Sequence, residues 1–534
     1  MKIKQFQRSA AFAGSVLLAA FGAQAANDFS VQNGTWIVTS EVDGNPGRGM
    51  AIDVQDGILV MQIYNYEASG QPTFHLSFGA MDGNHYSGTL TRYRGGRYYG
   101  SGPLDGVEDG QAGTVQIDFD SAHTGTIQFP GESPVAISRF NFDMIPPGSI
   151  ARPTIVSERW LMAELDDTDK PVNALLVNTG SLVFSPSPQI YPALSSVQSL
   201  KDGSTTGSTP CTYNGTTTRF KCEIQFGSSP TKRTLEWSKH LESMSGTISG
   251  TSECQLSPCV PVPTLRRVVG MRLGIDLTKS TAATYNNGEA QMDAPSANMA
   301  LPVYAVTPDP GTWIVSSELT GKPGRGMAID VQYDTLVMQV YNYESSGAPT
   351  FHLAIAPYGK NTATGHLKRY EGGRYFGSPA LSGHEVADVG EVKFSFSTPT
   401  RGTIQFPGEQ PVAMERYQFG TTAPSPQSLF GDWMIVDLEK NQLRHYNLNA
   451  VHSSDPNDAT GTGALLSIRC NYQGSGAAEA VRCRDQTIVS IDDYLFTPIN
   501  GRAIGSHERS GSSSTIYVLR VKDHNGTLAG LGKF

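Results

Sequence analysis

Gly34-Thr-Trp-Ile-Val38 recurs unchanged as Gly311-Thr-Trp-Ile-Val315, and Pro46-Gly-Arg-Gly-Met-Ala-Ile-Asp-Val-Gln55 recurs from Pro323 to Gln332. Residues 34–142 align with residues 311–419 at a constant shift of 277 positions, without a gap and with 63 identities in 109 positions. Self-similarity of this length indicates a folding unit that has been copied once, so the fold has to be derived for each copy separately.

Within the repeated unit, which we call A, hydrophobic and polar residues alternate with a period of two. Ile52 and Val54 alternate with Asp53 and Gln55, and the segment 59–67 continues the pattern. Such segments, separated by short Gly-, Pro- and Asn-containing turns, are typical of half-buried strands. We therefore predict an all-β fold, an antiparallel meander that can close into a barrel and so remove exposed edges.

A second kind of unit, which we call B, follows each copy of A. Glu158-Arg-Trp-Leu-Met162 opens the first B unit and Gly431-Asp-Trp-Met-Ile435 opens the second. The predicted order is therefore A1-B1-A2-B2, a tandem duplication of β modules. The expected boundaries are 30–146 for A1, 154–276 for B1, 277–310 for a linker, 311–420 for A2 and 428–534 for B2.

The N-terminus has the pattern of an export signal. A basic start with Lys2, Lys4 and Arg8 precedes an apolar stretch, and Ala23-Gln24-Ala25 supplies small residues at a cleavage site. We expect residues 1–25 to be a signal peptide, no transmembrane segment to remain after cleavage, and the protein to reach the periplasm or the exterior.

Six cysteines suit an oxidising destination. Cys211-Thr-Tyr213 and Cys470-Asn-Tyr472 look like copies of one site, with Cys222 and Cys483 at similar distances downstream. We predict the disulfides Cys211–Cys222, Cys470–Cys483 and Cys254–Cys259. The alternative, a zinc site, lacks the usual Cys-x-x-Cys pairs.

Composition excludes several classes. The formal net charge is −9, from 40 Lys+Arg against 49 Asp+Glu, and no basic block occurs, so a nucleic-acid partner is not expected. Neither a cofactor nor a metal is expected. Asp166-Asp-Thr-Asp169 and Asp455-Pro-Asn-Asp458 lack the spacing of a calcium loop and are interpreted as solvated turns.

The first strand of three units carries Gly-x-Trp, at Gly34-Thr-Trp36, Gly311-Thr-Trp313 and Gly431-Asp-Trp433, and resembles the first strand of calycin barrels, the lipocalins and avidins. Unit A as a whole resembles a module of secreted bacterial proteins without established function. The motifs that carry this resemblance are Gly47-Arg-Gly49, Tyr64-Asn-Tyr66 and Gly70-Gln-Pro-Thr-Phe74 with their second copies. It implies a secreted β module with no activity attached.

Both copies of A retain one set of polar and aromatic residues. Strand parity places most of them opposite the aliphatic face, where Tyr rings among amides, a carboxylate and an imidazole could hold a sugar or another polar ligand. The alternative is a solvated outer face with ordinary cross-strand pairs. The candidate ligand residues are Arg48, Asp53, Gln62, Tyr64, Tyr66, His75, Arg325, Asp330, Gln339, Tyr341, Tyr343 and His352.

No local catalytic motif occurs: Gly-x-Ser-x-Gly, His-Glu-x-x-His and a phosphate-binding glycine loop are all absent from the sequence. Catalytic residues stay unknown. Glu67 or Glu344 with Glu132 or Glu409 could supply the paired carboxylates of a glycoside hydrolase if they lie about 5–10 Å apart.

The sequence favours a non-enzymatic secreted or periplasmic protein, binding or structural, that engages a polysaccharide or other polar polymer or a cell surface through repeated Tyr-rich faces. The alternative is a secreted hydrolase of a polysaccharide or polyester with groups gathered from several strands. A purely structural envelope component is a third hypothesis.

Overall fold

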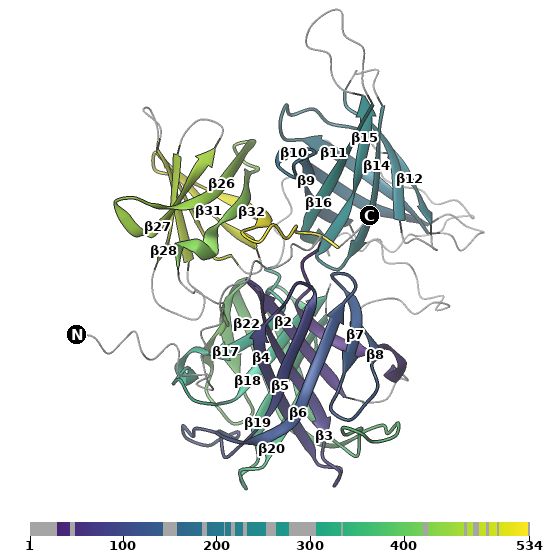
Figure 1. Ribbon diagram of the computed structural model, residues 1–534, viewed down its shortest axis with the longest axis vertical. Coiled ribbons are helices and arrows are strands. Elements are labelled where there is room, and N and C mark those ends of the chain that lie inside the picture. Colours follow the sequence, from purple (N-terminus) through teal and green to yellow (C-terminus); the bar gives the residue numbers. More distant parts are fainter. Residues whose placement is uncertain are drawn as a thin grey trace, which may run out of the picture.

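The computed structural model is built almost entirely of strands, arranged in four closed eight-stranded antiparallel barrels in the order A1-B1-A2-B2 (Figure 1). This confirms the predicted all-β tandem duplication. The structure describes residues 29–42, 48–142, 157–183, 190–207, 209–214, 219–227, 232–251, 263–276, 306–332, 335–419, 425–463, 467–473, 480–486, 491–498 and 501–531.

Barrels A1 and A2 have the same eight strands at equivalent positions, each strand paired with its sequence neighbours and the eighth with the first. The strands of A1 are β1 (Gly34–Val38), β2 (Gly49–Gln55), β3 (Ile58–Tyr66), β4 (Pro72–Ala80), β5 (His85–Arg94), β6 (Val107–Phe119), β7 (Thr124–Gln128) and β8 (Val135–Arg139). The strands of A2 are β17 (Gly311–Val315), β18 (Gly326–Gln332), β19 (Thr335–Tyr343), β20 (Pro349–Gly359), β21 (Thr362–Glu371), β22 (His384–Thr398), β23 (Arg401–Gln405) and β24 (Val412–Arg416).

Barrels B1 and B2 have the same meander topology although their sequences share little. The strands of B1 are β9 (Ser157–Leu165), β10 (Pro171–Val183), β11 (Ile190–Ser199), β12 (Thr209–Asn214), β13 (Arg219–Gln225), β14 (Lys232–His240), β15 (Ser243–Thr251) and β16 (Pro263–Asp276). The strands of B2 are β25 (Gly431–Asp437), β26 (Gln442–His452), β27 (Asp455–Gly463), β28 (Ser467–Gln473), β29 (Ala480–Gln486), β30 (Ile491–Phe496), β31 (Arg502–Arg509) and β32 (Ser512–Asp523).

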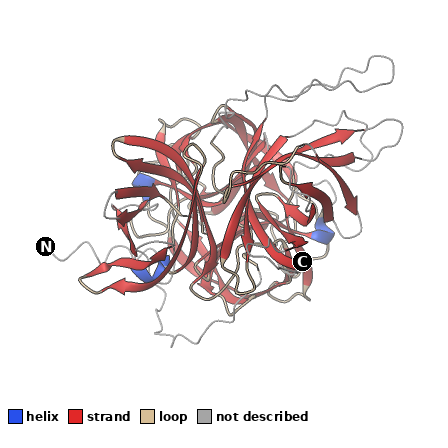
Figure 2. Ribbon diagram, turned by 90° about the horizontal axis from the view of Figure 1, so that it is seen from above, coloured by secondary structure: helices blue, strands red, loops and turns tan. Residues whose placement is uncertain are grey.

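Helical structure among the described residues is limited to short 3-10 turns, η2 (Thr39–Glu41), η4 (Ser316–Glu318) and η5 (Pro426–Leu429) (Figure 2). None of the helices in these residues has the length and apolar character needed to cross a membrane.

A tryptophan on the first strand anchors the core of every barrel. Trp36, Trp160 and Trp313 are fully buried and Trp433 nearly so. In three barrels the indole N–H donates to the carbonyl four residues earlier, at 2.7–3.0 Å. The ring therefore fills the interior while its polar group stays satisfied.

The barrels pack in two pairs. A1 and A2 lie side by side in the lower part of Figure 1, where β4 runs against β20, while B1 and B2 lie above them. The outer faces of β9, β10 and β16 meet β25 and β32 through an apolar cluster that includes Leu161, Met271, Met434 and Val521. Packing on the outside of a barrel explains why β2 and β3 are buried on both faces rather than one.

Two of the three predicted disulfides are present. Cys211 bonds Cys222 between β12 and β13, and Cys470 bonds Cys483 between β28 and β29, each joining directly opposite residues of the fourth and fifth strands. The equal placement indicates that B1 and B2 are copies of one ancestral barrel despite their divergence. Cys254 and Cys259, the predicted signal peptide 1–25, and residues 277–305 of the predicted linker lie outside the described residues.

We predict that Cys470→Ala with Cys483→Ala lowers the stability of barrel B2 by about 3 kcal/mol, because a cross-link over a separation of 13 residues restricts the unfolded chain. Chemical denaturation followed by the combined tryptophan emission would measure the loss as a lower unfolding midpoint. An unchanged midpoint would show that the barrel does not depend on this bond.

Candidate functional site

Two buried ion pairs join A1 to A2. They are equivalent, because each consists of the same aspartate position of one module and the same arginine position of the other. Arg416 donates to both carboxylate oxygens of Asp53, at 2.6 and 2.8 Å. Arg139 donates to both carboxylate oxygens of Asp330, at 2.6 and 2.9 Å. All four side chains are at most 2% exposed. Paired parallel hydrogen bonds of this kind specify one relative orientation of the two modules.

Each of these aspartates also binds the first strand of the opposite A module. The amide of Thr312 donates to Asp53 Oδ2 at 2.8 Å, and the amide of Thr35 donates to Asp330 Oδ2 at 3.0 Å. Each carboxylate therefore accepts at least three hydrogen bonds, which offsets the cost of removing its charge from water.

A further ion cluster lies at each side of the interface. Arg48 binds Glu41 at 2.8 Å and Glu132 at 2.7 Å within A1, and Arg374 of A2 approaches the same two carboxylates at 2.9 and 3.3 Å. The exchanged cluster consists of Arg325, Glu318 and Glu409 of A2 with Arg97 of A1.

The structure places the candidate ligand residues at the A1–A2 interface or in the barrel interior beside it. Eleven of the twelve are buried and Tyr341 is half-buried. The face that Asp53, Tyr64 and Tyr66 share is therefore neither open nor solvated, because the opposite module covers it. Their role in holding a ligand stays a prediction. The twelve are Arg48, Asp53, Gln62, Tyr64, Tyr66, His75, Arg325, Asp330, Gln339, Tyr341, Tyr343 and His352.

The predicted position of His75 on the tyrosine face is wrong. His75 pairs with Ile63 in the β3–β4 register, whereas Phe74 pairs with Tyr64. His75 therefore points to the barrel interior with Ile63, and Phe74 joins the tyrosine face. Hydrophobicity alone assigns Phe74 to the aliphatic core, and this is the reason for the error.

Inside the barrel, His75 Nδ1 lies 3.1 Å from Asn65 Oδ1, and Phe376 of A2 packs 5.1 Å from the imidazole ring. Burial, with a smaller effect of Arg92, lowers the pKa of His75 to about 4. His352 has the exchanged environment, with Asn342 at 3.1 Å and Tyr99 of A1 at 5.3 Å, and burial and Arg369 lower its pKa to about 3.

A cavity of about 80 Å³ opens at the A1–A2 interface, and we call it the inter-module cavity. Five aromatic rings contribute to its wall. Phe74 stacks on Tyr341 at 4.7 Å and lies parallel to Tyr93 at 6.3 Å. Four candidate ligand residues contribute to it, Gln62, Tyr341, Tyr343 and Arg325.

Tyr343 contributes to the wall of the inter-module cavity, and its buried hydroxyl has no hydrogen-bond partner among the described residues. Burial also raises the pKa of Tyr343 and of Tyr341, so both phenols stay protonated and able to donate. A buried donor without a partner is uncommon in native proteins, so this hydroxyl is a candidate donor to a ligand.

Three of the four carboxylates considered for glycoside hydrolysis, Glu132, Glu409 and Glu344, are bound by guanidinium groups. Burial alone would raise the pKa of Glu132, but hydrogen bonds from Arg48 and the Gly377 amide lower it overall, and Glu409 has the exchanged environment with Arg325 and Gly100. Glu344 binds Arg369 at 3.1 Å. A general acid needs a raised pKa, so Glu132 and Glu409 suit structural ion pairs better than proton transfer.

The aspartate segment of B1 forms the predicted turn, in which Asp166 Oδ1 accepts from the amides of Thr168 and Lys170. The prediction of a solvated turn at Asp455–Asp458 is wrong, because this segment begins strand β27 and Asp458 is buried. Asp455 Oδ1 accepts from the amide of Asn457 there. No group of three or more His, Cys, Asp or Glu side chains suited to a metal ion occurs in the described part of the chain.

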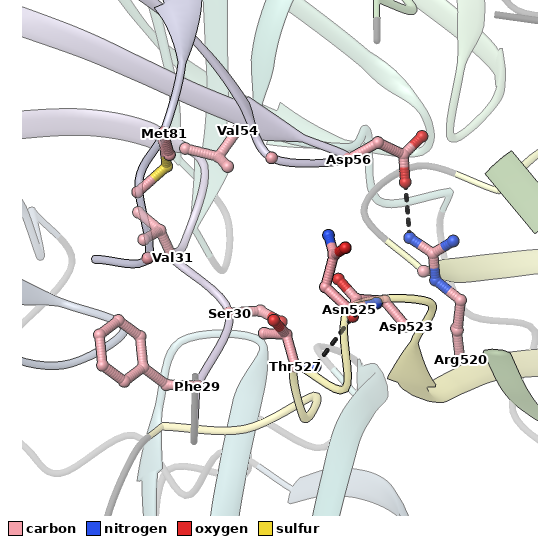
Figure 3. Close-up of a pocket in the computed structure, with 13 residues that line it drawn as sticks. Phe29, Ser30, Val31, Val54, Asp56, Met81, Arg520, Asp523, Asn525 and Thr527 are labelled. Atoms are coloured by element: carbon pink, nitrogen blue, oxygen red, sulfur yellow. Dashed lines mark hydrogen bonds and ion pairs between the residues drawn. The ribbon is translucent and has the colours of Figure 1, made fainter. Parts of the chain in front are cut away.

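A second cavity, of about 70 Å³, lies where A1 meets the end of B2 (Figure 3). Arg520 of β32 binds Asp56 of the β2–β3 turn at 2.7 Å and the carbonyl of Ser428 at 2.7 Å. Asp523 caps its own turn by accepting from the Thr527 amide at 2.8 Å. These groups are satisfied by one another, so this cavity marks a module junction.

Sequence reasoning did not identify Arg139 and Arg416, although both are retained between the copies. It also missed Tyr99 and Phe376, each of which packs against the core of the opposite A barrel. For the two arginines, the available signal was that the same residue occurs at equivalent positions in both copies. Strand parity was not applied to them. For Tyr99 and Phe376, which differ between copies and lie in Gly-rich loops, only the shared aromatic character was visible.

No protein-family model and no curated protein matches this chain.

We predict that Asp53→Asn destabilises the A1–A2 pair by about 3–5 kcal/mol, because it leaves the buried Arg416 without a counter-charge. Thermal unfolding would show the loss. Asp105→Asn is the matched control, since Asp105 binds Lys322 across the same interface but on its exposed rim. Equal effects of the two variants would contradict a special role for the buried pair.

We predict that stability falls as the pH drops from about 6.5 towards 4. The folded-state pKa values of His75 and His352, about 4 and about 3, lie below the ordinary histidine value of 6.5, so the unfolded chain binds more protons in this window. The variant His75→Gln/His352→Gln should show a shallower fall in melting temperature. His85→Gln, at an exposed histidine, should leave the slope unchanged, and parallel curves for all three proteins would refute the assignment.

Proposed function

We propose that the protein is a non-enzymatic binding protein exported to the periplasm or exterior, which holds a sugar unit of a polysaccharide or another hydroxyl-rich ligand in the inter-module cavity. The observation that carries the proposal is the inter-module cavity, whose wall includes five aromatic rings, together with the buried Tyr343 hydroxyl, which has no partner among the described residues. Rings supply apolar contact to the carbon faces of a sugar, and a phenol donates to one of its oxygens.

The two disulfides and the export signal in the sequence support a location outside the cytoplasm. The alternative of a secreted hydrolase would need a carboxyl group with a raised pKa beside the ligand. The carboxylate that lines the inter-module cavity, Glu318, is bound by Arg325 at 2.8 Å, which favours binding over catalysis.

The site also explains why a binding role suits paired modules. Val60, Gln62 and Tyr93 of A1 form one side of the inter-module cavity, while Thr312 and Tyr343 of A2 form the other. A ligand in this position would contact both modules at once and would stabilise their pairing by mass action.

We predict that Tyr343→Phe weakens ligand binding about tenfold, the effect of one lost hydrogen bond of about 1.4 kcal/mol, without lowering the melting temperature. Native electrophoresis in gels containing hydroxyethyl cellulose, dextran or alginate would measure retardation of the mature protein. Retardation by at least one of these polymers is expected for the wild type.

Tyr99→Phe is the matched control, because the Tyr99 hydroxyl is also buried and has no partner in the described part of the chain, but Tyr99 is not among the residues that line the cavity. It should bind as the wild type does. No retardation in any gel would count against the binding function, and equal retardation of both variants would count against this cavity as its site.

A further inference from the structure

Contacts between A1 and A2 occur in exchanged pairs. The amide of Gly95 donates to the Gly347 carbonyl at 2.8 Å, and the amide of Gly372 donates to the Gly70 carbonyl at 2.8 Å. Because 95 and 372, like 70 and 347, are equivalent positions in the two copies, one contact is the other with the modules exchanged.

The same exchange holds for side chains. Gln55 binds the main chain of 417 and 419 through both atoms of its amide, and Gln332 binds that of 140 and 142. Tyr99 of A1 packs against the A2 core, and Phe376 of A2 packs against the A1 core. Together with the reciprocal Asp–Arg pairs, these contacts make the interface isologous, meaning that each module presents the same self-complementary surface.

The groups that bind A1 are present on every A2 module, whether it belongs to the same chain or to another chain. A1 of one chain therefore meets in A2 of another chain the same groups that it meets in its own A2. The B1–B2 contact also joins the first half of the chain to the second. Exchange of whole halves, residues 29–276 for one and 306–531 for the other, would reproduce each of these contacts.

We propose that the partner for this surface is a second copy of this chain, and that two chains form a dimer by exchanging their second halves. The 29 residues 277–305 between the halves could span roughly 100 Å when extended, which does not restrict the exchange. Because the contacts are equal in both states, protein concentration relative to the effective concentration within one chain decides between closed monomer and exchanged dimer.

A close approach in the interface provides a steric test. A Cβ atom built on Gly96 of A1 would lie 2.1 Å from the ring of Tyr343 of A2, so Gly96→Ala introduces a clash. Tyr343→Ala removes the ring that the new methyl group would strike. The clash and its relief thus lie on different halves of the chain.

The experiment mixes two full-length mature chains, one carrying Gly96→Ala and the other Tyr343→Ala, unfolds them together and refolds them at high concentration. In the exchanged heterodimer, the substituted position 96 of one chain faces the substituted position 343 of the other across one A1–A2 interface, and the second interface is wild type. We expect a 1:1 species of twice the chain mass by native mass spectrometry, with each chain alone giving several-fold less dimer.

The matched control is one chain carrying both substitutions, Gly96→Ala/Tyr343→Ala, which relieves the clash internally. It should give the monomer–dimer ratio of the wild-type chain at the same concentration, which also shows that the substitutions are compatible with the fold. If the double variant folds and the mixture still yields no 1:1 dimer, the surface does not accept a second chain and the proposal is overturned.

Discussion

The reciprocal pairs Asp53–Arg416 and Arg139–Asp330 are the constraint on which the arrangement of this molecule depends. Each charge is buried, so each module carries an acid and a base that cannot stay unpaired without a large cost in free energy. Only a partner with the same two groups in exchanged positions satisfies both. The pairs therefore act mainly as a specificity device, selecting a single orientation of A1 on A2 from the many that apolar packing would allow.

This constraint also accounts for the polar residues that both copies retain. On an isolated barrel, Asp53, Gln62 and Tyr64 would form a wet outer face. In the molecule they form a second interior, shared by two barrels, in which Tyr64 meets Phe351 and Phe74 meets Tyr341 at 5.7 and 4.7 Å. The inter-module cavity is the part of that shared interior where the two surfaces do not close completely.

The period of two, the duplication and the cysteine spacing were sufficient to predict the all-β tandem architecture and two disulfides. The site was only partly predictable. Strand parity assigns side chains to one face of a strand. The sequence of the strand does not show whether that face contacts water or another module. His75 shows the limit, because the hydrophobicity of its neighbour Phe74 does not distinguish a barrel interior from an interface. The contact between A1 and A2 determines that Phe74 lies at the interface, and this contact is not visible in the pattern of a single strand.

Carrying both modules on one polypeptide has an evolutionary consequence. In an assembly of identical chains every substitution appears twice, at symmetry-related points, and must be tolerated at both. Here the equivalent positions 32 and 309 have diverged independently: Gln32 bonds both the carbonyl and the imidazole of His240 in B1, whereas position 309 is a half-buried aspartate. Duplication within one chain thus let a symmetric pair acquire two chemically different ends.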